Sequence, residues 1–200
     1  MLLAFDTATP LVTVALHDGE AVVGERVSER PMKHGEHLAP LIQELLAEHG
    51  LVRQDLTAVA VGVGPGPFTG LRVGLVTART LGWALEIPVY GACTLDVLAV
   101  EAAETGTVAD DFFVATDARR KEVYLAAYDV HGGRLDDPVV VRPDAAATDA
   151  AVVGQGALLY PEAFPNAVGP VRPSAGWLAR VVAEERADLR GEGWLGPVVP

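Results

Sequence analysis

A glycine-rich segment, VGVGPGPFTGLRVGL at residues 61–75, is the first candidate for chemistry in this sequence. It joins an apolar, β-branched run to a helical pattern, and the backbone N–H groups at such a junction often bind phosphate. A P-loop needs the pattern GxxxxGK[ST], whereas Gly66 and Gly70 have the wrong spacing and no lysine follows. The dinucleotide fingerprint GxGxxG also fails, because Pro67 and Thr69 stand where its third glycine is required. A general anion site at the start of the helix stays open as an alternative.

The same segment begins a stripe of small residues along one face of the helix that we expect over residues 67–85. A small residue recurs there at every fourth position, which places all of them on one side of a helix. Such a stripe lets another helix approach closely, either within the fold or across an interface with a partner. The stripe consists of Gly70, Gly74, Ala78 and Gly82, and Leu71, Leu75 and Leu81 flank it.

Neither a metal site nor a serine nucleophile is predicted. His34 and His37 have i,i+3 spacing, but Gly35 and their place before the first helical turn argue against a shared metal ion. The two serines, Ser28 and Ser174, lie on no strand-to-helix elbow, and the motif GxSxG is absent. We therefore expect no catalytic residue of either kind.

The elements that position these residues alternate in type along the chain. Apolar runs predict strands at residues 2–6, 11–17 and 20–28, the last two joined by a tight Asp18-Gly19 turn. Leucines at helical spacing predict the first helix near residues 36–49, and Gly50 ends it. The further elements expected are a strand at 57–63, helices at 67–85 and 94–104, strands at 87–90 and 138–142, and a last helix near 173–189.

Residues 112–135 repeat the pattern of the opening segment. In each copy an apolar strand ends in an aspartate, Asp6 or Asp117, and a second strand reaches another aspartate twelve residues later. A polar stretch between the copies suits a boundary, so we predict two related subdomains, residues 1–106 and residues 107–200. A duplicated unit of this kind is the layout of the actin-like ATPase fold, an α/β fold whose two halves are ribonuclease-H-like. We expect that fold here.

The turn Asp6-Thr7-Ala8-Thr9 offers a carboxylate and two hydroxyl groups directly after the first strand. In actin-like ATPases the corresponding turn meets nucleotide phosphates and a water molecule bound to Mg²⁺. Those enzymes usually have a glycine and a basic residue there, whereas Pro10 follows in this chain. A capped turn with a locally paired Asp6 is the competing interpretation.

Composition limits the classes of partner. The net charge is −12, with 27 acidic residues against 15 lysines and arginines, so unaided binding to nucleic acid is not expected. The basic run at residues 119–121 is interpreted as a solvated face. No apolar run reaches membrane-spanning length, the N-terminus lacks a basic region typical of signal peptides, and Cys93 alone cannot form an intramolecular disulfide. We therefore expect a cytoplasmic protein without a membrane partner.

Four segments resemble the TsaB (YeaZ) family. GVGPGPFTGLRVGL at 62–75 is similar to the family signature GPGSFTGLRIG, with Pro67 where the family more often has serine. The opening strand LLAFDTAT at 2–9 resembles the family's first strand, and HGEHLAPLIQELL at 34–46 its first helix. TDARRKEVYLAAY at 116–128 resembles the family's DAR-x-x-EVY segment.

The resemblance implies a role in making N6-threonylcarbamoyladenosine, the modified base beside the anticodon of certain tRNAs. It implies a non-catalytic subunit, without metal or cofactor, that binds TsaD together with TsaE and meets tRNA only through that complex. In TsaD a histidine pair holds a metal, and the corresponding segment here, residues 93–104, has no histidine. A homodimer is expected when TsaD is missing. The interface carried over onto the first-half helices would use Leu41, Leu45, Gly70, Leu71, Gly74, Leu75 and Ala78.

Two enzymatic functions remain as alternatives. An actin-like kinase or ATPase would use the candidate nucleotide site, and weak ATP or ADP binding at a vestigial form of that site is compatible with the scaffold function as well. A glycoprotease-type peptidase is the weaker alternative, because neither a metal site nor a nucleophile is predicted. The candidate nucleotide site consists of Asp6, Thr7, Thr9 and Asp117.

Overall fold

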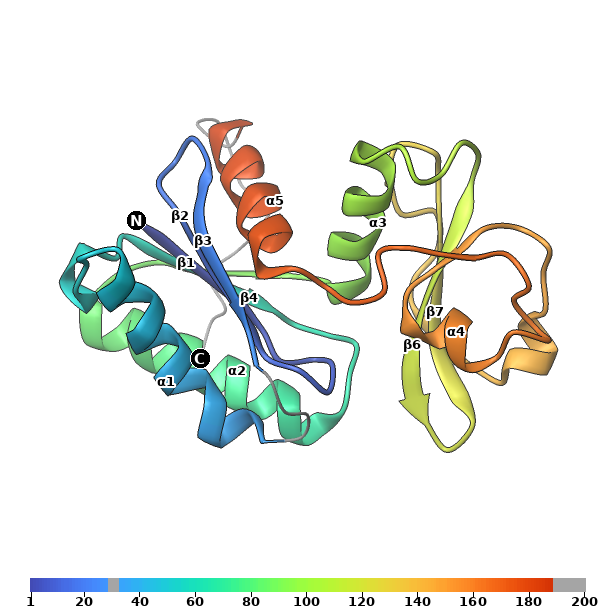
Figure 1. The fold of residues 1–200 in the computed structure, drawn as a ribbon, viewed down its shortest axis with the longest axis horizontal. Helices are drawn as coiled ribbons and strands as arrows, with labels where there is room; N and C mark the ends of the chain where they lie inside the picture. Colours follow the sequence, from blue (N-terminus) through green and yellow to red (C-terminus); the bar gives the residue numbers. More distant parts are fainter. Residues whose placement is uncertain (29–32, 189–200) are drawn as a thin grey trace. The chain divides into compact units, whose positions relative to one another are not determined.

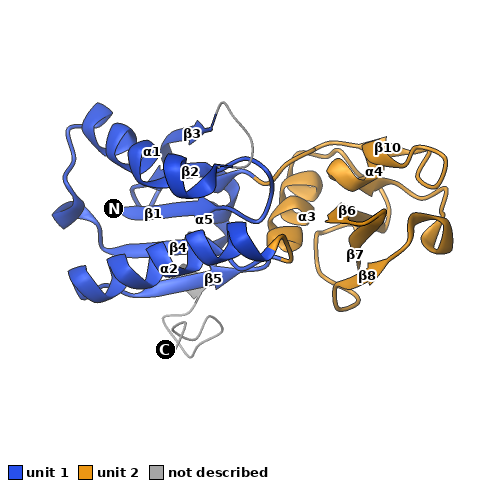
Figure 2. Ribbon diagram, turned by 90° about the horizontal axis from the view of Figure 1, so that it is seen from below, with its two compact units in different colours: residues 1–64, 68–93, 174–200 blue, residues 65–67, 94–173 orange. Residues whose placement is uncertain are grey.

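The computed structural model describes residues 1–28 and 33–188, which form two compact units. Unit 1 contains residues 1–64, residues 68–93 and the described chain from Ser174 onward, and unit 2 contains residues 65–67 and 94–173 (Figure 2). These limits differ from the predicted subdomains 1–106 and 107–200. The helix that follows residue 93 belongs to unit 2, and the last helix of the chain packs in unit 1.

Unit 1 is built on a five-stranded sheet with the strand order β3-β2-β1-β4-β5. β1 pairs antiparallel with β2 and parallel with β4, so the opening hairpin continues into a parallel half. β2 and β3 are antiparallel, and β4 and β5 are parallel. The strands are β1 (Leu2–Asp6), β2 (Thr13–His17), β3 (Val22–Val27), β4 (Ala58–Gly62) and β5 (Val89–Ala92).

Helices cover both faces of this sheet. α1 (His34–Glu48) and α2 (Phe68–Leu85) lie side by side on one face, and α5 (Ala175–Asp188) lies on the other (Figure 1). A short 3₁₀ helix, η1 (Arg53–Asp55), precedes β4. Because both faces are covered, every residue of β1, β2 and β4 is buried, which explains why apolar residues dominate these strands. Asp6, Thr13 and His17 are buried polar residues at the ends of β1 and β2.

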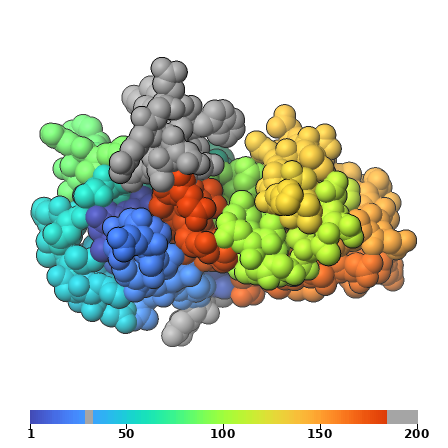
Figure 3. Space-filling view, turned by 90° about the horizontal axis from the view of Figure 1, so that it is seen from above, coloured from blue at the N-terminus to red at the C-terminus, as the bar shows by residue number. Residues whose placement is uncertain are grey.

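α5 is held in unit 1 by both polar and apolar contacts. The Oγ atom of Ser174 donates a hydrogen bond to Oε1 of Glu25 on β3 at 2.9 Å and accepts one from the backbone N–H of Trp177 at 3.1 Å. Leu178 and Val182 are fully buried on the side of the helix that meets the sheet. Figure 3 shows α5 beside the β2–β3 hairpin. The last helix was predicted at the right place in the sequence, but its assignment to the second subdomain is corrected, because its apolar side packs on β1 and β2.

Unit 2 contains a second five-stranded sheet, with the order β10-β9-β6-β7-β8. α3 (Thr94–Glu104) and α4 (Gln155–Leu159) pack against β6, and η2 (Pro143–Ala146) follows β8. Val114, Ala115 and Val123 are fully buried at its centre. The strands are β6 (Phe112–Arg119), β7 (Glu122–Tyr128), β8 (Val139–Val141), β9 (Val152–Val153) and β10 (Ala167–Val168).

The two sheets have the same topology. Written as β8-β7-β6-β9-β10, the second sheet has the same sequence of antiparallel and parallel pairings as β3-β2-β1-β4-β5. β6 therefore corresponds to β1. This agrees with the predicted repeat, because Asp6 ends β1 and Asp117 lies near the end of β6. The predicted duplicated, actin-like α/β fold is confirmed. Among the helices of the described residues, none combines the length and the apolar character needed to cross a bilayer.

Candidate partner interface

The glycine-rich turn between β4 and α2 is shaped by the side chain of Asp6. Asp6 is 1% exposed, and its Oδ1 atom accepts a hydrogen bond from the backbone N–H of Ala8 at 2.6 Å. A Cβ atom on Gly62 would overlap the Asp6 carboxylate, and Gly64 has a φ of +88°, which favours glycine. Packing and backbone conformation therefore account for these two glycines without a bound phosphate.

The small-residue stripe of α2 packs against the turn that follows β1 and against strands of its own unit. The hydroxyl group of Thr7 donates a hydrogen bond to the carbonyl oxygen of Gly70 at 2.8 Å. A Cβ atom on Gly70 would overlap the Thr7 carbonyl oxygen, and a Cβ atom on Gly74 would overlap the Thr7 hydroxyl. A Cβ atom on Gly82 would overlap the side chain of Val89 on β5. The stripe lets α2 lie very close to the sheet.

This packing corrects part of the predicted interface. Gly70, Gly74 and Ala78 are buried against the sheet of unit 1, and Leu45 is 1% exposed in the same core. The periodicity was interpreted correctly as a close-packing surface, but that surface packs within unit 1, against the Thr7 turn, the sheet and His34 of α1. The other three predicted interface residues, Leu41, Leu71 and Leu75, are partly accessible, and Leu41 and Leu75 pack against that core.

The opposite side of α2 carries large apolar side chains that are exposed. The exposed fractions are 71% for Phe68, 61% for Val76 and 84% for Trp83. Arg72 and Arg79 are exposed on the same side, and the Arg72 guanidinium lies 4.7 Å from the centroid of the Phe68 ring. Intervals of three, four and seven residues keep these positions on one side of a helix. We call Phe68, Arg72, Val76, Arg79 and Trp83 the α2 outer face.

The α2 outer face was missed in the sequence, although a signal for it was present. Once a stripe of glycine and alanine is assigned to the buried side of a helix, large apolar residues on the other side have no core to enter. Phe68, Val76 and Trp83 occupy that side. Exposed aromatic and arginine side chains together are typical of protein interfaces.

The four candidate nucleotide residues all make hydrogen bonds within their own unit. Thr9 donates its hydroxyl hydrogen to the Leu11 carbonyl oxygen at 3.2 Å, in addition to the hydrogen bonds of Asp6 and Thr7 described above. In unit 2, Asp117 accepts a hydrogen bond from the backbone N–H of Arg119 at 2.8 Å and pairs with its guanidinium at 3.3 Å. These contacts agree with the interpretation of the Asp6 turn as a locally paired turn.

His34 connects α1 to the same turn. It is 8% exposed, and its Nε2 atom lies 2.7 Å from the carbonyl oxygen of Thr9. That contact fastens the first turn of α1 to the β1–β2 connection. Within residues 1–28 and 33–188, no group of three or more His, Cys, Asp and Glu side chains is arranged to hold a metal ion.

The turn between β6 and β7 has an unusual backbone. Arg119, Arg120 and Lys121 have φ values of 66°, 53° and 64°, in the left-handed region that is normally taken by glycine or asparagine. Each such residue costs on the order of 1 kcal/mol. Three cationic side chains are therefore presented on a turn that the backbone itself disfavours.

Comparison with known proteins places the chain in a family. A family model described as "TsaD: tRNA N6-adenosine threonylcarbamoyltransferase" matches residues 22–157. The solved structure "YeaZ from Pseudomonas aeruginosa" superposes with a TM-score of 0.77 at 30% identity, over 100% of this chain and 99% of that chain. The chain belongs to the TsaB (YeaZ) family.

One named relative agrees with this assignment to the TsaB (YeaZ) family, and an uncharacterized relative is more similar in sequence. The tRNA threonylcarbamoyladenosine biosynthesis protein TsaB of Bacillus subtilis is 32% identical over 138 residues, covering 69% of this chain and 59% of that protein. An uncharacterized protein of Mycobacterium tuberculosis (strain H37Rv) is 44% identical over 189 residues, covering 90% of this chain and 84% of that protein. The chain thus aligns with less than two thirds of the length of the Bacillus protein.

Proposed function

We propose that this chain is a non-catalytic, cytoplasmic subunit that binds TsaD, together with TsaE, for transfer of a threonylcarbamoyl group to the adenosine beside the tRNA anticodon. Membership of the TsaB (YeaZ) family supports the pathway, since relatives of known name are threonylcarbamoyladenosine biosynthesis proteins. The observation that carries the proposal is the α2 outer face, an exposed apolar surface with two arginines on a chain of net charge −12.

The chemistry of the α2 outer face defines the partner that would fit it. Trp83 and Phe68 present large apolar areas, and burying one such side chain is worth about 1.5–3 kcal/mol. Arg72 and Arg79 lie among them, so a partner helix with apolar residues flanked by carboxylates would complement the surface. We propose that TsaD supplies such a helix, and that a second copy of this chain occupies the face when TsaD is missing.

The non-catalytic part of the proposal is supported by the Asp6 turn. The Asp6 carboxylate is buried and bonded to Ala8, and the Thr7 hydroxyl is bonded to α2. Both groups therefore already take part in stabilising unit 1. tRNA would meet this subunit through the complex.

Co-purification with TsaD tests the interface. Val76→Glu places a charge in the centre of the α2 outer face, and we expect it to reduce recovered TsaD at least tenfold. Val52→Glu is the matched control, because Val52 is 58% exposed and lies outside α2, against 61% for Val76. Equal recovery of TsaD with a folded Val76→Glu variant would contradict the interface. Reconstitution of tRNA modification from the other components, with and without this chain, tests the function itself.

A further inference from the structure

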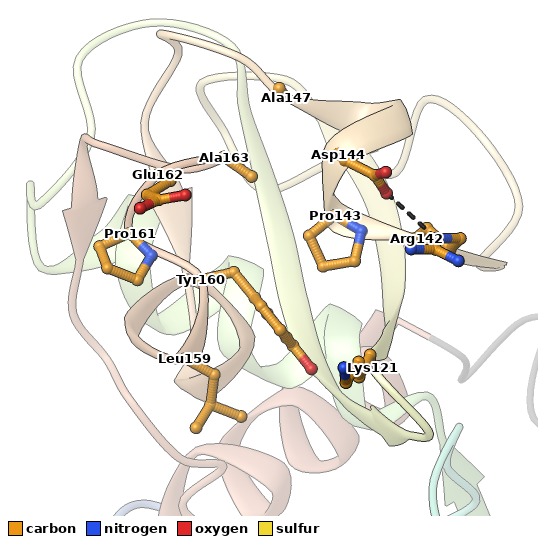
Figure 4. A pocket seen from close by; sticks show the side chains of 10 residues that line it. All are labelled: Lys121, Arg142, Pro143, Asp144, Ala147, Leu159, Tyr160, Pro161, Glu162 and Ala163. Carbon is orange, nitrogen blue, oxygen red and sulfur yellow. Dashed lines mark hydrogen bonds and ion pairs between the residues drawn. The ribbon is translucent and has the colours of Figure 1, made fainter.

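Unit 2 contains a pocket whose opposite sides carry opposite charges. Its volume is about 710 Å³, within the range of small-molecule sites. Lys121 and Arg142, the latter paired with Asp144, lie on one side and Glu162 on the other (Figure 4). Tyr160 extends between them with its hydroxyl end toward Lys121. All of these residues belong to unit 2, whereas the α2 outer face belongs to unit 1.

The cationic side of the pocket suits an anionic group such as phosphate. Lys121 ends the left-handed turn between β6 and β7, and within the described parts of the chain it forms no ion pair. Arg142 pairs with Asp144 through its Nε atom at 3.2 Å, which leaves the other N–H groups of the guanidinium for a ligand. A disfavoured backbone that presents a cation at the edge of a pocket is a recurring feature of functional sites.

The middle of the pocket suits a flat aromatic group. Tyr160 is half-buried against the core of unit 2, and Leu159, Pro143 and Pro161 extend this apolar lining. An aromatic side chain held beside apolar neighbours can stack on a heteroaromatic ring. The Glu162 carboxylate, exposed on the far side, can accept hydrogen bonds from an amino group on that ring.

We propose that this pocket binds a nucleotide with an amino-bearing base. The phosphate contacts Lys121 and Arg142, the base lies against Tyr160, and its exocyclic amino group donates to Glu162. A free nucleotide and one nucleotide of a single-stranded RNA share this chemistry. The acidic net charge of −12 opposes a long RNA at long range, so a free nucleotide is the simpler source.

Titration of the full chain with 5′-AMP, followed by calorimetry and NMR, tests the proposal. We expect saturable binding that is weakened at least fivefold by Lys121→Gln and by Tyr160→Leu. Adenosine, which lacks the phosphate, should bind at least fivefold more weakly than AMP and should not distinguish Lys121→Gln from the unmodified chain. Arg53→Gln, which removes an exposed cation of unit 1, is the control and should leave the affinity unchanged.

A single-stranded hexa-adenylate RNA distinguishes the two sources. RNA binding more than tenfold tighter than AMP, with the same sensitivity to Lys121→Gln, assigns the nucleotide to an RNA chain; equal or weaker binding assigns it to a free ligand. Absence of binding by both probes overturns the proposal, and so does binding that Lys121→Gln leaves unchanged. Lys121 is exposed, so that variant remains informative even where Tyr160→Leu fails to fold. Loss of TsaD binding would leave this result unaffected.

Discussion

The hydroxyl group of Thr7 donates a hydrogen bond to the carbonyl oxygen of Gly70 at 2.8 Å, which fastens the end of β1 to the first turn of α2. The same hydroxyl occupies the space where Gly74 would carry a Cβ atom. One threonine thus requires two glycines in a helix that would otherwise be more stable with alanine. The glycine motif and the Asp6-Thr7 turn are two parts of one packing arrangement.

Gly74→Ala should therefore destabilise the fold. The added methyl group meets the Thr7 hydroxyl and lies 3.6 Å from Cγ2 of Val61, and overpacking of this kind costs about 1–3 kcal/mol. Urea unfolding measures the change. The matched control is Gly35→Ala, where a Cβ atom would meet nothing within 4 Å, and it should be neutral or slightly stabilising.

A double-mutant cycle identifies the cause of that destabilisation. In a Thr7→Ala background the obstructing hydroxyl is absent, so Gly74→Ala should cost less than it does in the unmodified chain. Additive effects of the two substitutions would show that some other contact is responsible.

Asp6→Ala should lower stability without changing the response to nucleotide. The substitution leaves the buried N–H of Ala8 without its acceptor, and a buried donor without a partner costs about 1–3 kcal/mol. Thermal unfolding with and without Mg-ATP measures both effects. A rise in melting temperature caused by Mg-ATP in the unmodified chain, and lost in Asp6→Ala, would instead favour the kinase or ATPase alternative.

Arg120→Gly should stabilise the protein, although it removes a side chain. Arg120 has a φ of 53°, which glycine adopts freely. Glycine also has more conformational freedom in the unfolded chain, which offsets part of this effect, so the free energy of unfolding should rise by about 0.5–1 kcal/mol. Chemical denaturation provides the measurement. Arg134→Gly, at a residue outside the positive-φ set, is the control and should not stabilise; a similar gain at both positions would count against the backbone explanation.

His17 should make stability depend on pH. It is 4% exposed, and burial lowers its pKa below 6.5; the Arg180 charge acts in the same direction, while Asp18 and Glu184 oppose it. The unfolded chain therefore binds more protons than the folded chain between the two pKa values, so the stabilisation is complete above pH 6.5 and is lost as the pH falls below it.

Urea midpoints measured from about pH 5 to pH 8 test the titration of His17. His17→Asn is the comparison, because an Asn oxygen can replace the Nδ1 atom that accepts from the Gly19 N–H at 3.0 Å. The variant should lose less stability at low pH than the unmodified chain. The same slope in both proteins would assign the pH dependence to other groups.

Local patterns predicted the fold well, because they record burial and repetition directly. The two strands that carry Asp6 and Asp117 predicted the duplication, and the identical pairing of the two sheets confirms it. Position in space was harder to predict. α5 joins a sheet formed by residues about 150 positions earlier, and the contact between Ser174 and Glu25 leaves no periodic signal in the sequence.

The candidate interface shows the same limit. The small residues of α2 indicate that another part of the protein approaches this helix closely. A neighbouring strand and a neighbouring helix both require small residues at such a contact, so Gly70, Gly74 and Ala78 could not reveal which one is present. Only the structure, with Thr7 against that face, assigns it to the interior and leaves Trp83 and Val76 on the outside.

The return of the chain to unit 1 at Ser174 has a consequence for synthesis on the ribosome. Residues 94–173, which form nearly all of unit 2, emerge as one continuous stretch and can fold as soon as they are made. The first sheet emerges earlier but remains uncovered on one face until α5, which follows all of unit 2 in the sequence, has also been made. The sheet of unit 1 is therefore completed only after unit 2 has emerged, and until then chaperones have access to the α5-facing side of β1 and β2.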